Sequence, residues 1–291
     1  MTVQHYWAPT ELPAALEHLR GGDVTVMAGG TDLMPQSHAG RVTLKSGLLN
    51  INRIDALRTI EPDGNGLRIG ALVTISSLMR HALVQQHAAV LCEAADHFAS
   101  DQLRNAATLG GNICNASPAG DTLPPLLVLD AQVELCSQPN GRTVMRRVPL
   151  AEFFTGPGRT VRAPHELVCA VWLPTPPAGF AARFYKAGTR PALDISTVSI
   201  ALGGVATAAG SSKALTQARV AFGAVGPTPV RGRATEAALE GCPLDAAAIE
   251  RIAGVARDEV KPIDDVRATA WYRKELIFNI TQRMLGDVAS N

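Results

Sequence analysis

The 291-residue sequence lacks the common motifs of metal sites and of nucleotide sites. Its five cysteines stand singly with no Cys-x-x-Cys pair, and its seven histidines include no His-Glu-x-x-His. These spacings argue against a structural zinc site and against an iron–sulfur cluster held within this chain. There is also no Gly-x-Gly-x-x-Gly and no Gly-Lys-Ser/Thr, so the Rossmann fingerprint and the P-loop are both missing. We predict no metal site, and a nucleotide site here needs another architecture.

An excess of charge of one sign and long apolar runs are missing too. With 27 basic and 26 acidic residues the net charge is +1, so the chain lacks the concentrated positive field that nucleic acid or an anionic membrane requires. No apolar run reaches membrane-spanning length, and the N-terminal segment lacks the basic and apolar regions of a secretory signal. We predict a cytoplasmic protein with no nucleic-acid partner and no membrane span.

The composition is that of a folded protein with more than one domain. It is 46% hydrophobic and 18% charged, and the chain is long enough for two or three domains. The proline-rich stretch at residues 174–179 is the best boundary in the sequence. We predict three units, at residues 1–55, 56–177 and 178–291.

Local patterns predict the main elements of each unit. In the first, a helix at 11–20 with Thr10 as N-cap precedes strands at 23–27 and 47–54. In the second, a hairpin turns at residues 63–66 and Thr74 caps a helix. Further elements follow at 75–87 (helix), 88–98 (helix), 121–137 (a buried segment leading into a strand) and 166–174 (strand). In the third, three antiparallel strands are predicted at 182–190, 194–210 and 217–226, and two helices follow at 245–260 and 268–285. Strands first and helices after suggest an α+β domain.

Two stretches place a pair of glycines beside short polar side chains. The first, residues 28–32 (AGGTD), follows a predicted strand, and the second, residues 108–112 (TLGGN), repeats its chemistry. Without Cβ atoms a ligand can approach the backbone, and consecutive N–H groups can point the same way and hold phosphate oxygens. A glycine pair in a loop is more often only a turn, so either stretch alone is a weak signal. Together they favour a diphosphate held from both sides.

Longer motifs in the same order along nearly the whole chain carry a resemblance to a known family. They include MAGGTDLMPQ, NAATLGGNICNASPAGDTLPPLLVLDAQVEL, FFTGPGRTV, HELVCAVWLP, RFYKAGTRPALDIS and RVAFGAVGPTPVRGRATEAALEG. With them the sequence resembles the FAD-binding medium subunits of the xanthine dehydrogenase/carbon monoxide dehydrogenase family, the molybdenum hydroxylases. The resemblance implies an α+β fold. A two-part FAD-binding domain of the vanillyl-alcohol oxidase (PCMH) type, at 1–55 and 56–177, precedes a C-terminal α+β domain at 178–291.

The resemblance also implies which residues bind FAD. Backbone amides of both glycine stretches would cradle the diphosphate, in the first from Ala28, Gly29, Gly30, Thr31, Asp32 and Leu33, and in the second from Thr108, Leu109, Gly110, Gly111 and Asn112. Asp121 matches a cofactor-binding position, where a carboxylate can accept two bonds from a sugar diol. Phe98, Val168 and Lys186 match further contact positions. By residue type alone, Phe98 could equally be a core residue, Val168 a side chain packed within a strand, and Lys186 a solvated charge at the end of a strand.

Two differences from other family members indicate which kind of flavoprotein this sequence encodes. Family members that reduce hydroxybenzoyl-CoA carry a cysteine-rich insertion for a four-iron cluster before the position of Asp121, whereas here that interval holds only Cys114. We therefore expect no such cluster. Some proteins of this fold attach the flavin through histidine, but neither glycine stretch contains one, and His38 lies beyond the first. We predict FAD bound without a covalent link.

The resemblance implies a role within a complex. In the family, molybdopterin and the [2Fe-2S] clusters reside on a separate large subunit and small subunit, and the complexes are commonly dimers of heterotrimers. This chain would pass electrons from the iron–sulfur clusters to an external acceptor, and we predict no catalytic residue in it. The alternative is a free-standing FAD-dependent oxidoreductase with its own small substrate, which needs acid–base groups over the flavin. Substrate and final acceptor stay open.

Overall fold

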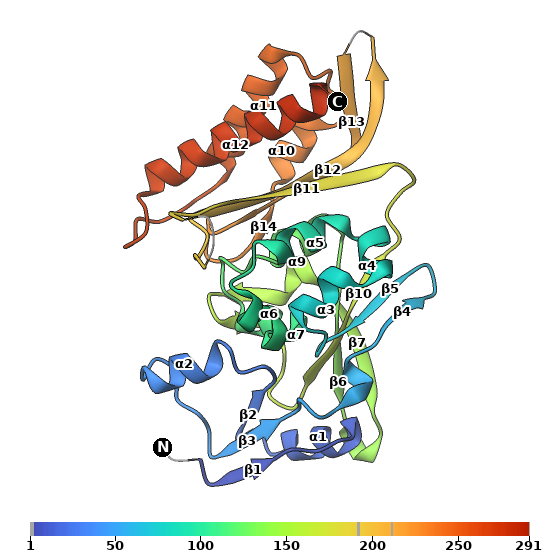
Figure 1. The fold of residues 1–291 in the computed structure, drawn as a ribbon, viewed down its shortest axis with the longest axis vertical. Coiled ribbons are helices and arrows are strands. Elements are labelled where there is room, and N and C mark those ends of the chain that lie inside the picture. Colours follow the sequence, from blue (N-terminus) through green and yellow to red (C-terminus); the bar gives the residue numbers. More distant parts are fainter. Residues whose placement is uncertain (1–2, 191–192, 211, 291) are drawn as a thin grey trace.

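The computed structural model describes residues 3–190, 193–210 and 212–290. Figure 1 shows three groups of elements along the long axis. We call them the first unit (β1 to β3), the middle unit (β4 to β10) and the C-terminal unit (β11 to α12). Each unit has its own sheet and its own helices. No helix in the described ranges is both long enough and apolar enough to cross a membrane.

The first unit is a parallel three-stranded sheet in the order β1-β3-β2. Leu16 and Leu19 of its first helix and Leu49 of β3 are fully buried and form its core. Its elements are β1 (His5–Trp7), α1 (Leu12–Leu19), β2 (Val24–Met27), α2 (Leu33–His38) and β3 (Gly47–Asn50).

Two details of the first unit correct the prediction. Helix α1 begins after Glu11 and has no side-chain cap, so Thr10 is not its N-cap. Pro13 in its first turn has no N–H, which leaves fewer amides to be capped. Strand β3 ends at Asn50 rather than at residue 54, because Asn50 Oδ1 accepts the amide of Asn52 at 3.0 Å and turns the chain.

The middle unit is built on an antiparallel sheet in the order β4-β5-β10-β6-β7. These strands are β4 (Ile60–Asp63), β5 (Gly66–Gly70), β10 (Leu167–Pro174), β6 (Gln132–Ser137) and β7 (Val144–Pro149), and a small hairpin of β8 (Phe154–Gly156) and β9 (Arg159–Thr160) stands apart. The predicted hairpin is confirmed, since Asp63 pairs with Gly66. The helices are α3 (Ile75–Arg80), α4 (Ala82–His87), α5 (Ala89–Asp96), α6 (Asp101–Ala106), α7 (Leu109–Asn115), α8 (Leu123–Val128) and α9 (Leu150–Phe153).

The single helix predicted at 75–87 is in fact two helices. Thr74 caps α3 as predicted, because its Oγ1 accepts the amide of Ser77 at 3.1 Å. At His81 the chain is extended, with ψ of 122°, and α4 begins after it. Leu78 and Val84 are both fully buried, although on one continuous helix they would point about 120° apart. The break turns both side chains into the core.

The C-terminal unit is an antiparallel four-stranded sheet covered by helices on one face (Figure 1). Its elements are β11 (Phe180–Ala187), β12 (Val198–Ala209), β13 (Ser212–Gly223), β14 (Val230–Arg231), α10 (Arg233–Leu239), α11 (Ala246–Glu259) and α12 (Ala270–Ser290). The predicted strands and the two long helices are present, and α10 and β14 are additional. Strand β13 starts before residue 217, because a bulge at Gln217 (φ 52°) interrupts the alternation that the sequence shows.

The C-terminal sheet is buried on both faces. Tyr185 and Ile200 face the helices of their own unit, whereas the adjacent Phe184 and Ala201 belong to the core of the middle unit. This alternation follows the two-residue period of a strand. Helices α5 and α8 of the middle unit contact that second face. The middle and C-terminal units are therefore joined by a continuous apolar contact.

Candidate functional site

The first glycine stretch links β2 to α2 and has unused backbone donors. The amides from Gly29 to Leu33 have no acceptor within the described part of the chain. Gly30 has a φ of +70°, which a residue without Cβ adopts freely. A Cβ on Gly29 would lie 1.9 Å from the carbonyl oxygen of Ala106, so this glycine is required for close packing against the last residue of α6. Consecutive free N–H groups of this kind suit phosphate oxygens.

The second glycine stretch is different, because its amides are already used. Leu109 N donates to Val73 O (3.0 Å) and Gly110 N to Ala71 O (2.9 Å). Thr108 Oγ1 accepts the Gly111 amide at 3.0 Å and caps α7. A Cβ on Gly110 would lie 2.6 Å from the Cβ of Ala71. Gly110 is thus explained by packing on the middle unit, and the amides of Leu109, Gly110 and Gly111 have acceptors within the protein, unlike those of the first stretch.

The two glycine stretches nevertheless lie side by side. Gly29 contacts the backbone of Ala106, two residues before Thr108. Gly111 is exposed, so part of the second stretch faces solvent. On its other side this stretch is tied to β10, since Ala71 N donates to Cys169 O at 2.8 Å. The structure therefore brings together both stretches that the sequence singles out.

Val168 lies next to this junction with its side chain in the core. It is buried at 3% exposure among the apolar residues of the middle unit. The β10–β6 pairing shifts register between Val168 and Ala170, which leaves Cys169 as the bulged residue that reaches Ala71. The ordinary reading of Val168, packing in a strand, accounts for its side chain.

Asp121 and Lys186 form a buried ion pair across the middle and C-terminal units. Lys186 Nζ lies 2.7 Å from Asp121 Oδ2, and the side chains are 8% and 11% exposed, respectively. Burial raises the pKa of Asp121 above its usual range, and the nearby ammonium of Lys186 acts in the opposite direction. Lys186 is therefore not the solvated strand-end charge that its sequence position alone suggests.

Phe98 joins the same cluster through its neighbour. Lys186 Nζ donates to the carbonyl of His97 at 3.1 Å, and the carbonyl of Phe98 accepts from Arg104 Nη1 at 2.9 Å. The Phe98 ring is half-buried and packs on the core of the middle unit. An aromatic ring that is only partly buried suits contact with a flat apolar group.

Two further residues of the cluster were not predicted. Ser196 Oγ lies 3.4 Å from Asp121 Oδ1 and 3.3 Å from Ala119 O. Thr122 Oγ1 donates to Asn112 Oδ1 at 2.6 Å and connects Asp121 to the second glycine stretch. Ser196 stands inside the motif RFYKAGTRPALDIS, which is the only sequence signal for it. Among the residues that the structure describes, no group of three or more His, Cys, Asp or Glu side chains could hold a metal ion.

Comparisons with known proteins identify the family. A family model described as the FAD binding domain in molybdopterin dehydrogenase matches residues 1–176, and one described as the CO dehydrogenase flavoprotein C-terminal domain matches residues 183–288. The chain belongs to the FAD-binding medium subunits of the molybdenum hydroxylase family. This membership confirms the predicted family, the α+β fold, FAD as the cofactor and the oxidoreductase class.

Individual relatives of this medium subunit cover nearly its full length. The putative xanthine dehydrogenase FAD-binding subunit of Escherichia coli is 33% identical over 268 residues, which is 91% of this chain and 88% of the relative. The carbon monoxide dehydrogenase medium chain of Hydrogenophaga pseudoflava is 29% identical over 282 residues, 96% and 95% of the two chains. A solved structure of carbon monoxide dehydrogenase from that organism matches with a TM-score of 0.88 at 29% identity, covering 97% of this chain and 96% of that chain.

Proposed function

We propose that this medium subunit binds FAD without a covalent link where the two glycine stretches and the polar residues around Asp121 meet. The observation that carries the proposal is the run of amides from Gly29 to Leu33 with no acceptor in the described ranges, beside a contact that only a glycine permits. These amides would donate to the diphosphate, and Ala28 precedes them directly after β2. The exposed part of Thr108–Asn112 would bound the diphosphate from the other side.

The remaining cluster would hold the rest of the cofactor. Asp121 would accept hydroxyl bonds from a sugar, Phe98 would contact a flat ring, and Lys186 would keep positive charge beside the cofactor. Val168 would act through packing and through the backbone next to it. When bound, FAD supplies the ability to take up electrons singly and release them in pairs.

We further propose that the chain is the electron-transfer subunit of a heterotrimeric hydroxylase. Its partners would be a large molybdopterin-binding subunit and a small [2Fe-2S] subunit, assembled as a dimer of heterotrimers. Support comes from the family and from relatives that are themselves medium chains or medium subunits. The chain would pass electrons from the partner's clusters to an external acceptor. We place the complex in the cytoplasm and divide this chain at 1–55, 56–177 and 178–291.

Purification from the native host without stripping partners tests the proposal. We expect FAD together with two further chains, one carrying molybdopterin and one carrying iron–sulfur clusters. Acid precipitation should release the flavin into the supernatant, and flavin left on the pellet would show a covalent link. A lone chain that holds FAD and turns over a small substrate by itself would refute the electron-transfer role and favour a free-standing oxidoreductase.

A further inference from the structure

Helix α8 connects the cofactor cluster to a second polar cluster at its other end. Asp121 and Thr122 immediately precede the helix, and Asp130 follows it. Every residue of α8 is buried, and a helix of this length is about 9 Å long. A shift of its carboxyl end therefore moves Asp121 and Thr122 as well, since close-packed surroundings give the helix no room to bend.

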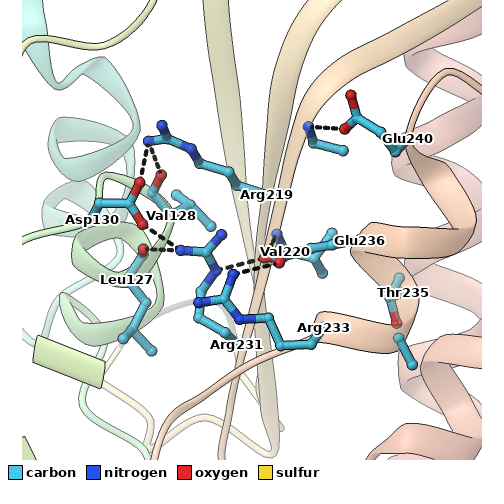
Figure 2. Close-up of polar contacts among 12 residues, drawn as sticks. Leu127, Val128, Asp130, Arg219, Val220, Arg231, Arg233, Thr235, Glu236 and Glu240 are labelled. Atoms are coloured by element: carbon cyan, nitrogen blue, oxygen red, sulfur yellow. Dashed lines mark hydrogen bonds and ion pairs between the residues drawn. The ribbon is translucent and has the colours of Figure 1, made fainter. Parts of the chain in front are cut away.

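Two arginines of the C-terminal unit bind the carboxyl end of α8 (Figure 2). Arg219 of β13 donates through Nη1 to Val128 O at 3.0 Å and lies 3.0 Å from Asp130 Oδ2. Arg231 of β14 donates through Nη1 to Leu127 O at 3.1 Å and to Asp130 Oδ1 at 2.5 Å. These bonds reach the last carbonyls of the helix, of which that of Leu127 also accepts the Asp130 amide at 3.1 Å, and the cations suit the negative end of the helix dipole.

The arginines are themselves fixed by the C-terminal unit. Arg231 is only 8% exposed, and its Nε lies 2.5 Å from Glu236 Oε1 of α10. The same oxygen accepts the backbone amide of Val220 at 2.9 Å. The guanidinium of Arg219 also lies 4.9 Å from the centre of the Phe180 ring. The contact with α8 thus comes from a rigid surface, not from freely moving side chains.

We propose that Arg219, Arg231 and Asp130, here called the α8 anchor, are positioning residues for the cofactor site. The anchor holds α8 so that Asp121 stays in place against Lys186 and Thr122 stays in place against Asn112. This inference rests on the proposed binding of FAD at Asp121. It assigns a cofactor-related role to residues at the opposite end of α8 from Asp121.

The test compares two substitutions in the full-length chain. Asp130→Asn removes the charge that both arginines share, and Asn tolerates the positive φ of this position (52°). Arg183→Gln is the matched control, because Arg183 and Glu93 form another ion pair between the same two units, at 2.9 Å, and the hydrogen bonds of Arg183 go to Glu93 of α5 rather than to α8. FAD affinity is measured by titrating each apoprotein, and the visible circular dichroism of bound flavin is recorded at saturation.

We expect Asp130→Asn to weaken FAD binding about tenfold, within the usual range of coupling between distant sites, and to change the flavin dichroism. Arg183→Gln should keep the wild-type affinity and spectrum. Unchanged affinity in Asp130→Asn overturns the inference, and so does equal weakening in both variants, which would indicate general loosening of the two units. If Asp130→Asn fails to fold, Arg219→Gln decides, since it leaves Arg231 and Glu236 paired. A wild-type chain that binds no FAD would instead refute the proposed site itself.

Discussion

Replacing Asp121 with Asn leaves the ammonium of Lys186 buried without its counter-ion. Both side chains are nearly inaccessible, at 8% and 11% exposure, so water does little to solvate the unpaired charge. Breaking one side of a buried ion pair costs about 3–5 kcal/mol. We expect the free energy of unfolding of the Asp121→Asn apoprotein to fall by about that amount.

The double variant Asp121→Asn/Lys186→Met separates the lost attraction between the two side chains from the penalty of leaving one buried charge unpaired. Lys186→Met should cost less than Asp121→Asn, because burial already raises the pKa of Asp121 and the carboxyl can take up a proton when Lys186 is gone. With both groups replaced, neither charge remains to be desolvated, so part of the stability returns. We expect a coupling energy of about 2–3 kcal/mol from the cycle.

Urea unfolding of the four apoproteins, followed by tryptophan fluorescence, measures this coupling. The control cycle uses Arg183 and Glu93, whose side chains are 77% and 25% exposed, and it should give at most about 1 kcal/mol. A coupling energy below about 0.5 kcal/mol for Asp121 and Lys186 would refute the reasoning. It would mean that water reaches the pair and that burial does not govern its energetics.

Three further substitutions test other parts of the structure. Gly29→Ala should cost at least about 3 kcal/mol and abolish FAD binding, because its Cβ would lie 1.9 Å from Ala106 O; a thermal scan with wild-type behaviour would contradict the packing. Thr108→Val removes the cap of α7 and should lower the free energy of unfolding in urea by about 1 kcal/mol. An unchanged free energy would mean that the cap is not formed. The hydrogen bond from Arg146 lowers the pKa of Glu166. The stabilisation from this pair is therefore fully present above the usual glutamate pKa, and it is lost as the pH falls through the lowered pKa. Glu166→Gln should therefore reduce stability at pH 7 and flatten its decline in acid, and parallel pH–stability curves would disprove this.

The tight loop of the first glycine stretch was predictable from the sequence, but which backbone donors are free was not. The pattern AGGTD after a strand indicates a tight loop that a ligand can approach, and the structure agrees. Whether an amide is free depends on what lies opposite, however. Gly110 and Leu109 donate to Ala71 and Val73, which follow β5 nearly forty residues earlier. Local sequence contains no information about that partner, so the two glycine pairs looked alike.

Contacts between units were the other limit of prediction. Lys186 was placed near the cofactor only by the family resemblance, and Ser196 was not predicted at all. Both reach Asp121 because the C-terminal sheet packs its second face on α5 and α8. A residue type in a strand or loop does not indicate which distant element it will meet, so such partners appear only in the folded chain.

The limits of the site do not coincide with the limits of the matched domain. The family model for FAD binding ends at residue 176, yet Lys186 and Ser196, which contact the carboxylate of Asp121, lie beyond it. Arg219 and Arg231, which hold the other end of α8, lie beyond it too. A buried carboxylate without these partners would take up a proton or move to solvent. If FAD binds as proposed, Asp121 would have its binding geometry only when the C-terminal unit is docked, and this unit would be part of the cofactor site.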